Sequence, residues 1–320
     1  MRVGILGCGV IGGKRASALG QDRLTAVCDR DPARAEALAA RTGARPCGSP
    51  AELFGHCDAV VVATTNDQLA PLTAEALEAG KHVLVEKPAA RNAAELQPVV
   101  ALAARHGRVV KVGFNHRFHP GAIRAREILD GGECGPVLFV RARYGHGGRL
   151  GYEREWRADP AVAGGGELID QGVHLIDLAR WYLGAEFARI SAQTATFFWN
   201  MPVDDNAFLT LTTGSGQVAH LHASCTEWKN LFSFEIYCRN AKLHLEGLGG
   251  SYGVERLYHY RMRPEMGPPE TVIHEYPGAD QSWELEWRDF SRAATTGGVV
   301  CGGLPDALAA LRIVDEVYGR

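Results

Sequence analysis

Lys87, Asp170 and His174 are residue types suited to proton transfer. Asp170 and His174 lie four residues apart in a predicted helix over Glu167–Leu183, so a regular helix would place both on one face. There the acid can orient the imidazole and stabilise its protonated form. Such a pair is also typical of a surface or capping interaction. The glycines Gly164-Gly-Gly166 before this helix favour close approach of backbone to a ligand.

Lys87 follows a predicted strand and precedes Pro88. Proline biases the residue before it toward an extended backbone, which would aim the amine at the crevice beyond the strand. Taken alone, a Lys-Pro pair after a strand is also compatible with an ordinary loop.

The chain begins with a pattern typical of a nucleotide site. Gly7-x-Gly9-x-x-Gly12 follows the apolar residues Val3, Ile5 and Leu6 and leads into a helical segment over Gly13–Leu19. The first glycine permits a tight turn, the second admits a pyrophosphate, and the third allows close helix packing. We therefore predict cofactor contacts along this loop, from Gly7, Gly9, Val10, Ile11 and Gly12.

Asp29 ends the next predicted strand, Leu24–Cys28, about 20 residues past the glycines. A carboxylate at this place accepts hydrogen bonds from both ribose hydroxyls and repels a 2′-phosphate, which favours NAD over NADP. Arg30 acts in the opposite direction, because an arginine can pair with that phosphate or stack on adenine. We predict NAD as the cofactor, with NADP as the weaker candidate.

The composition is that of an ordinary globular protein, with 46% hydrophobic and 22% charged residues and a net charge of −3. No basic block indicates nucleic-acid binding, and no apolar run approaches a membrane span. The eight cysteines are scattered, without a CxxC or a Cys/His cluster, so we predict neither a metal site nor a disulfide framework. The N-terminus leaves no room for a signal peptide, and we expect a cytoplasmic protein.

Residues 1–120 alternate predicted strands and helices, which favours a doubly wound parallel sheet. Asp31 is a predicted N-cap of a helix over Pro32–Arg41. The strand Asp58–Ala63 ends in Thr64-Thr65-Asn66, where ligands of such sheets bind. The strand Lys81–Val85 runs into Glu86-Lys87-Pro88. The last strand of the six that we expect is Arg108–Val112.

Residues 121–320 are predicted to form a second, α/β domain. Strands succeed one another without helices between them, and tight turns suggest an antiparallel meander that forms a large open sheet. One face of such a sheet needs a partner to cover it. The chain ends with predicted helices over Gln281–Thr295 and Pro305–Tyr318, and the last is a candidate to pack back on the first domain.

The segment Tyr144–Arg157 is rich in groups that bind sugars or phosphates. Trp156 can stack on a ring, while Arg149 and Arg157 can pair with phosphate or carboxylate. A mobile surface loop with solvated charges is the alternative. His116 follows the last strand of the first domain and is a candidate to reach the site. His220 and His222 share one strand face, where a sheet-face or interface role is favoured over a metal site.

Taken together, these motifs resemble the glucose–fructose oxidoreductase/inositol dehydrogenase (Gfo/Idh/MocA) family over nearly the full chain. The matching pieces are Gly7–Gly12, Thr64-Thr65-Asn66, Glu86-Lys87-Pro88, Gly113–Arg117 and Gly164–His174. The resemblance implies a Rossmann domain followed by an α/β domain whose open sheet mediates dimers or tetramers. It also implies NAD(P)-linked chemistry at a secondary carbon of a sugar or cyclitol.

Carried over by position, Lys87, Asp170 and His174 would be catalytic and would line the meeting point of nicotinamide and substrate. The full set of expected cofactor contacts is Gly7, Gly9, Val10, Ile11, Gly12, Asp29, Arg30, Thr64, Thr65, Asn66, Glu86, Lys87, Asn115, Trp156 and Arg157. The expected substrate contacts are Lys87, His116, Tyr144, Arg149, Asp170 and His174.

The leading hypothesis is an NAD-dependent dehydrogenase that oxidises a secondary hydroxyl of a sugar, amino-sugar or sugar-nucleotide to a ketone, or runs in reverse. The first alternative is an inositol or cyclitol dehydrogenase. The second is a regulator that binds dinucleotide without turnover, against which the joint presence of Lys87, Asp170 and His174 argues. The expected partners are a small carbohydrate substrate and further copies of the chain, as a homodimer or homotetramer.

Overall fold

The computed structural model describes residues 1–320 and divides the chain into two compact units, each described here by itself. The first unit consists of Met1–Asn115, Ala161–Gly164 and Trp283–Arg312. The second unit consists of His116–Pro160, Gly165–Ser282 and Ile313–Arg320. The predicted domains, 1–120 and 121–320, differ from this division chiefly because the chain returns to the first unit after residue 282.

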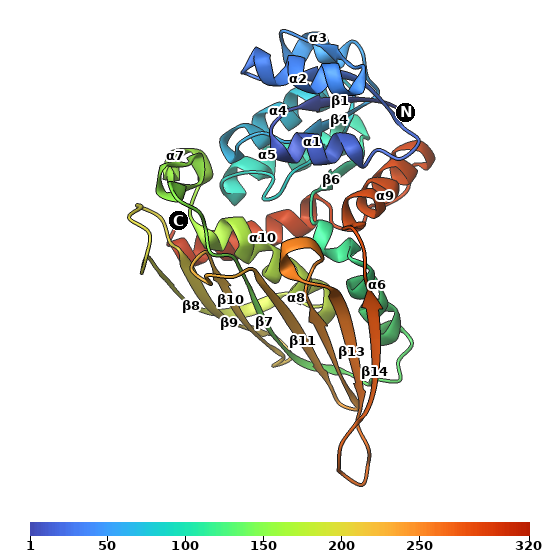
Figure 1. The fold of residues 1–320 in the computed structure, drawn as a ribbon, viewed down its shortest axis with the longest axis vertical. Coiled ribbons are helices and arrows are strands. Elements are labelled where there is room, and N and C mark those ends of the chain that lie inside the picture. The colour runs from blue at the N-terminus through green and yellow to red at the C-terminus, as the bar shows by residue number, and fades with distance from the viewer. The chain divides into compact units, whose positions relative to one another are not determined.

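The first unit is built on a parallel sheet with the strand order β3-β2-β1-β4-β5-β6, of which β1, β4 and β6 are labelled in Figure 1. Its strands are β1 (Arg2–Leu6), β2 (Arg23–Cys28), β3 (Arg45–Pro46), β4 (Ala59–Val62), β5 (His82–Val85) and β6 (Val110–Val112). Every neighbouring pair is parallel. The order changes direction between β1 and β4, which confirms the predicted doubly wound sheet and places its switch point there.

Helices cover both faces of this sheet. The helices of the first stretch are α1 (Val10–Ser17), α2 (Pro32–Thr42), α3 (Pro50–Phe54), α4 (Asn66–Glu78) and α5 (Ala93–His106). The predicted N-cap of α2 is confirmed, since the Asp31 side chain accepts a hydrogen bond from Ala33 N. No helix anywhere in the chain combines the length and the apolar character that crossing a membrane requires.

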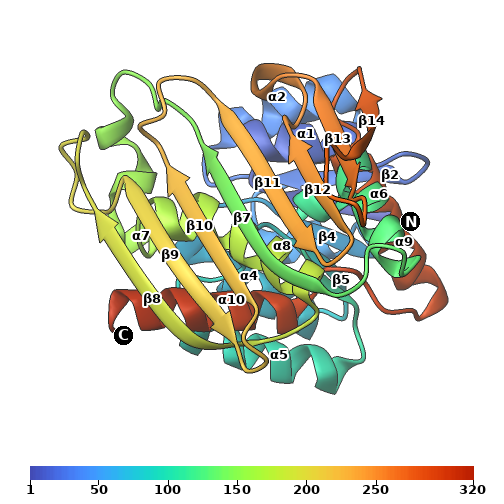
Figure 2. The same cartoon turned by 90° about the horizontal axis from the view of Figure 1, so that it is seen from below.

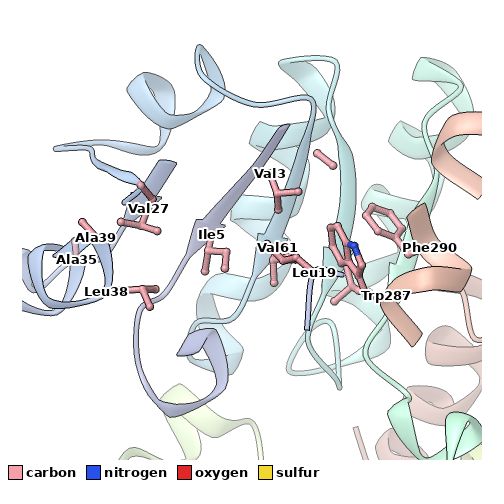
Figure 3. Close-up of a cluster of buried hydrophobic side chains, with 13 residues drawn as sticks. Val3, Ile5, Leu19, Val27, Ala35, Leu38, Ala39, Val61, Trp287 and Phe290 are labelled. Atoms are coloured by element: carbon pink, nitrogen blue, oxygen red, sulfur yellow. The ribbon is translucent and has the colours of Figure 1, made fainter. Parts of the chain in front are cut away.

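The core of the first unit includes residues that are distant in sequence (Figure 3). Val3 and Ile5 of β1 point to one face of the sheet, as alternation in a strand requires. Trp287 and Phe290, which are nearly or fully buried, join this core from α9 (Ser282–Thr296). Each large aromatic side chain buries about 150–250 Å². This packing explains why part of the predicted second domain belongs to the first unit.

A buried cation ties α1 to two other elements of the same unit. Arg15 is only 1% exposed, and its Nε and Nη1 donate to Glu86 Oε1 (2.7 Å) and Glu286 Oε2 (2.6 Å). The guanidinium carbon of Arg15 lies over the Trp283 ring, 4.4 Å from the ring centroid. Because an unpaired buried charge is costly, the positions of α1, α9 and the end of β5 depend on one another.

The second unit carries an eight-stranded sheet in the order β14-β13-β12-β11-β7-β10-β9-β8. Its strands are β7 (Val137–Gly145), β8 (Phe187–Ala195), β9 (Asn206–Thr213), β10 (Val218–Ser224), β11 (Leu231–Cys238), β12 (Ala241–Glu246), β13 (Glu255–Arg261) and β14 (Glu270–Tyr276). The predicted open, mostly antiparallel sheet is confirmed. The expected continuous meander is wrong, because β7 inserts between β10 and β11 and pairs with β10 in parallel.

Helices pack on one face of this sheet, and Figure 2 looks onto the other face, where no helix lies in front of the strands. The remaining helices of the chain are α6 (Pro120–Asp130), α7 (Pro160–Ala163), α8 (Val173–Leu183) and α10 (Leu304–Tyr318), with a π-helix over Leu168–Gly172. Short 3₁₀ turns occupy Asn115–Phe118, Tyr152–Arg154, Trp156–Ala158 and Gly250–Tyr252. On β7 the side chains alternate between buried Val140 and Ala142 and exposed Phe139 and Arg141.

We predict that Arg15→Met lowers the free energy of unfolding by about 3–5 kcal/mol, because it leaves Glu86 and Glu286 buried without their shared cation. Arg34→Met is the matched control, since the Arg34 side chain is 61% exposed in its pair with Asp31, and we expect a change within about 1 kcal/mol. Urea unfolding followed by circular dichroism measures both. Equal losses for the two variants would contradict the role given to Arg15.

Candidate functional site

The glycine loop between β1 and α1 has the geometry that its sequence pattern predicts. Gly7 has φ +92°, and a Cβ there would lie 2.4 Å from the Ala63 carbonyl oxygen. A Cβ on Gly12 would lie 1.9 Å from the Gly7 carbonyl oxygen. Gly9 precedes α1 with open space where its Cβ would stand. Backbone packing therefore requires the first and third glycines, while the second leaves room for a pyrophosphate.

Asp29, at the end of β2, is bonded directly to this loop. One carboxylate oxygen accepts a hydrogen bond from Cys8 N (2.6 Å) and the other from Asp31 N (2.9 Å). Each oxygen keeps a further lone pair for a ribose hydroxyl. Arg30 is exposed beside it, and Val10 is 79% exposed on the loop. These residues fit an adenosine ribose and pyrophosphate at the switch point of the sheet.

The polar residues after β4 are only partly available to a ligand. Thr65 is the N-cap residue of α4, and its hydroxyl donates to Asp67 Oδ1 (2.6 Å). The Asn66 side chain is buried and donates through Nδ2 to the Ala163 carbonyl oxygen (2.8 Å). Thr64 is half-buried. Asn66 therefore anchors the Ala161–Gly164 stretch to the first unit, a structural role that its sequence position did not reveal.

Glu86 and Lys87 occupy different environments. The carboxylate of Glu86, a predicted cofactor contact, is buried and forms an internal ion pair with Arg15. Lys87 is half-buried, and the peptide bond that joins it to Pro88 is cis. Asn115, another predicted cofactor contact, is buried at the end of the first stretch of this unit. The Arg15–Glu86 pair thus holds the backbone from which the Lys87 side chain extends.

In the second unit the structure brings three predicted site residues together. The rings of His116 and His174 stack, with centroids 3.8 Å apart and planes at 30°. The Tyr144 ring meets His116 edge-on at 4.9 Å and His174 at 6.1 Å. All three side chains are buried. Burial raises the pKa of Tyr144 well above its ordinary value, so its hydroxyl stays protonated and able to donate a hydrogen bond.

Asp170 lies on the π-helix rather than on the regular α-helix that we predicted from Glu167 onward. The i,i+4 geometry of an α-helix therefore does not describe its relation to His174. Asp170 Oδ2 accepts a hydrogen bond from Arg157 Nε (3.1 Å). The Arg157 guanidinium lies over the Trp156 ring at 4.5 Å. Burial alone would lower the pKa of Arg157, but the charge of Asp170, the largest opposing cause, and smaller contributions together outweigh burial and raise that pKa, so the guanidinium stays charged.

The loop that follows β7 is ordered by charge pairs. Glu155 Oε2 accepts from Arg149 Nη2 (2.6 Å) and lies 3.8 Å from Arg157 Nη1. Arg149 also lies over the Tyr152 ring, 5.9 Å from its centroid. The predicted loop residues Arg149, Trp156 and Arg157 therefore form one connected group with Asp170.

The sequence did not identify the group that holds the entrance to the π-helix. Asp204 accepts hydrogen bonds from Gly166 N (3.1 Å), Leu168 N (2.8 Å) and the Tyr318 hydroxyl (2.6 Å). A Cβ on Gly166 would lie 2.0 Å from the Asp204 carbonyl oxygen, which explains the third glycine of the triplet. Asp204 lies 38 residues away from Gly166, so no local pattern connects the two.

The candidate residues thus fall on both units. The first unit carries the glycine loop, Asp29, Arg30, Thr64, Thr65, Asn66, Glu86, Lys87 and Asn115. The second unit carries His116, Tyr144, Arg149, Trp156, Arg157, Asp170 and His174. His220 and His222 lie on β10, where they bond Thr210 (3.1 Å) and Asn206 (2.9 Å) respectively. No group of three or more His, Cys, Asp or Glu side chains has an arrangement that could hold a metal ion.

We predict that Gly9→Ala weakens NAD binding at least tenfold and leaves the melting temperature unchanged, because the added methyl group enters open space that the pyrophosphate needs. Gly12→Ala should instead destabilise the fold, since its Cβ overlaps the Gly7 carbonyl. Gly13→Ala, which also meets nothing within 4 Å, is the control. Calorimetric titration with NAD and thermal unfolding measure these effects. Unchanged affinity in Gly9→Ala would contradict the loop's role.

Two family models match successive parts of the chain. Residues 1–114 match the model of the oxidoreductase family with an NAD-binding Rossmann fold, and residues 122–244 match the GFO/IDH/MocA C-terminal domain. An inositol 2-dehydrogenase of Saccharopolyspora erythraea is 33% identical over 68% of this chain and 64% of its own length, which is less than two thirds of that protein. An inositol 2-dehydrogenase of Rhizobium meliloti is 28% identical over 98% of this chain and 95% of its own.

Solved structures share the fold of the whole chain. An oxidoreductase domain protein from Kribbella flavida has a TM-score of 0.87 at 25% identity, covering 99% of this chain and 96% of its own. GenD2 from gentamicin A biosynthesis, in complex with NAD, has a TM-score of 0.85 at 25% identity, covering 100% of this chain and 93% of its own.

A further sequence relative, an inositol 2-dehydrogenase of Paenarthrobacter aurescens, is 32% identical over 69% of this chain and 68% of its own length. On the two family matches and these relatives, the chain belongs to the GFO/IDH/MocA family of oxidoreductases with an NAD-binding Rossmann domain.

Proposed function

We propose that this protein is an NAD-dependent dehydrogenase that converts a secondary hydroxyl of a sugar, amino-sugar or sugar-nucleotide to a ketone, or catalyses the reverse reaction. The observation that carries the proposal is the buried cluster of His174, His116 and Tyr144 in a chain whose first domain binds NAD. A buried imidazole beside a neutral phenol can accept and return a proton while water is excluded.

In the proposed reaction, the glycine loop and Asp29 would hold NAD, which would supply the hydride acceptor for oxidation of the substrate carbon. His174 accepts the hydroxyl proton, and the Lys87 ammonium hydrogen-bonds the same oxygen as negative charge develops on it. Asp170, held by Arg157, is assigned the role of orienting His174. His116 supports the His174 ring by stacking, and the Tyr144 ring packs edge-on against both imidazoles.

A cyclitol is the second candidate substrate, favoured by the relatives named inositol 2-dehydrogenase. Sugars and cyclitols both present a secondary hydroxyl on a six-membered ring, so the same proton-transfer groups serve either. A panel of sugars, amino-sugars, sugar-nucleotides and inositols, assayed for NADH formation, separates the two candidates. NAD binding without NADH formation from any compound in either direction would favour a regulator that binds the dinucleotide without turnover.

We also propose that further copies of the chain cover the open face of the eight-stranded sheet, giving a homodimer or homotetramer. Phe139, Phe208 and Ile273 are 40%, 37% and 52% exposed on its strands. A broad sheet of this kind with apolar groups in water is typical of an interface.

For the location of the protein we propose the cytoplasm. The eight cysteines are all free, which fits the reducing conditions there.

We predict that Lys87→Ala and His174→Ala each lower kcat about a hundredfold or more, because each removes a group that acts on the reacting oxygen. His106→Ala, a half-buried histidine of α5, is the control and should leave kcat unchanged. Steady-state NADH formation with the best compound of the panel measures all three, and titration with NAD verifies that the cofactor still binds. Near-normal rates in both Lys87→Ala and His174→Ala would contradict the catalytic roles assigned to these residues.

The carboxylate of Asp29 predicts that NADP binds at least tenfold more weakly than NAD, because a 2′-phosphate would meet a negative charge where the ribose hydroxyls bind. Asp29→Asn should narrow the difference by removing the charge. Calorimetric titration of both proteins with each dinucleotide measures the preference. Equal or tighter binding of NADP by the unmodified protein would show that Arg30 dominates.

A further inference from the structure

The second unit exposes aromatic side chains beside the loop that carries Arg149. Phe197, Phe198 and Trp228 are 68%, 53% and 78% exposed, and Leu150 next to Arg149 is fully exposed. A cluster of large apolar groups in water marks an interaction site more often than a chance arrangement does. None of these residues takes part in the chemistry proposed above.

The exposed rings continue inward as a row of ring contacts. The Trp228 ring meets Phe198 at 5.0 Å, Phe198 meets Trp199 at 5.0 Å, and Trp199 meets Tyr152 at 5.5 Å. We call these four residues the aromatic ridge. The distances and tilted planes are those of favourable aromatic pairs. The ridge therefore runs from solvent to Tyr152, which is 4% exposed.

The inner end of the ridge lies within the electrostatic reach of the candidate site. Burial, followed by the charges of Asp170 and Glu167, raises the pKa of Tyr152. The His146 ring contacts Tyr152 at 5.6 Å, and His146 Nε2 lies 3.9 Å from Glu167. The aromatic ridge is thus an outward extension of the group around Asp170.

Hydrogen bonds to the Asp205 carboxylate and the Cys225 carbonyl hold the ridge in place. Asp205 accepts hydrogen bonds from Phe197 N (2.9 Å), Phe198 N (2.7 Å) and Trp199 N (3.0 Å). Trp199 Nε1 donates to the Cys225 carbonyl oxygen (2.9 Å). A binding surface that is already ordered loses little entropy when a ligand arrives.

Two glycines fit the neighbouring loop against the ridge. A Cβ on Gly148 would lie 2.4 Å from Trp199 Cζ2, and a Cβ on Gly147 would lie 3.1 Å from Trp228 Cα. Gly148 also has φ +67°. The Arg149 loop therefore packs directly on the residues of the ridge, so a ligand held by Arg149 would also reach the rings.

We propose that the aromatic ridge is an outer subsite that stacks a second ring carried by the substrate, so that the sugar oxidised at His174 is one unit of a larger glycoside or sugar conjugate. This inference rests on the proposed function. The apolar face of a sugar ring or a nucleobase packs on Trp and Phe rings. The inner end of the ridge, Tyr152, contacts His146 beside Glu167, so the ridge is continuous with the candidate site, and this favours a part of the bound substrate over a second protein copy as its occupant.

The test compares one-ring sugars with conjugates that carry a second ring. The probes are D-glucose against maltose, and N-acetylglucosamine against UDP-N-acetylglucosamine, so that the two arms separate a second sugar from a nucleobase. We expect at least one conjugate to exceed its parent about tenfold in kcat/KM with NAD. Trp228→Ala and Phe198→Ala should abolish that preference without changing kcat/KM for the one-ring parent. Trp228→Phe, which keeps a ring, should retain it.

Met266→Ala, which removes an 86% exposed side chain from the turn between β13 and β14, is the matched control. An enzyme that oxidises the one-ring sugars and gains nothing from a second ring overturns the subsite and leaves the proposed function standing. The absence of NADH from every compound counts against the proposed function, and the subsite fails with it. A smaller assembly of Trp228→Ala in sedimentation would make the ridge a subunit contact and also overturn the proposal.

Discussion

Arg15 carries its positive charge inside the first unit, and the arrangement around it constrains much of that unit. Glu86 at the end of β5 and Glu286 on α9 both bond the guanidinium, so strand end, first helix and a late helix share one cation. A buried charge is stable only when its partners keep their geometry. Lys87 is the residue after Glu86, so the backbone that carries the proposed reactive amine is held by an internal ion pair and not by the ligand.

The second unit uses carboxylates in a different way, by bonding backbone N–H groups. Asp204 holds the entrance to the π-helix, and Asp205 holds the loop that carries Phe198 and Trp199. Burial raises the pKa of Asp204, whereas the backbone and Asn206 hydrogen bonds outweigh burial and lower the pKa of Asp205. Asp204 and Asp205, the two residues before β9, therefore order both the π-helix that carries Asp170 and the aromatic ridge.

Local patterns predicted what depends on local physics. The glycine spacing, the N-cap at Asp31 and the alternation along the strands gave the parallel sheet and most element boundaries, because each reflects contacts within a few residues. The two-residue β3 is too short to show a period. The place of β7 between β10 and β11 depends on pairing of distant strands, which a meander pattern does not encode.

The candidate site was predictable as a set of residues and less so as a set of contacts. His116, Tyr144 and His174 lie together, and the pairing of Asp170 with Arg157 and of Glu86 with Arg15 joins residues 13 and 71 positions apart. The hydrogen bond by which Asn66 anchors the Ala163 carbonyl joins residues 97 positions apart. Long-range hydrogen bonds of this kind leave no periodic signal in one sequence.

The return of Trp283–Arg312 to the first unit has a practical consequence for any attempt to express that unit alone. A fragment cut after the last parallel strand would lack two core aromatic residues and one of the carboxylates that neutralise Arg15. Such a fragment would expose a hydrophobic face and bury an under-compensated cation. A self-sufficient nucleotide-binding piece would need the late segment Trp283–Arg312 joined back to it.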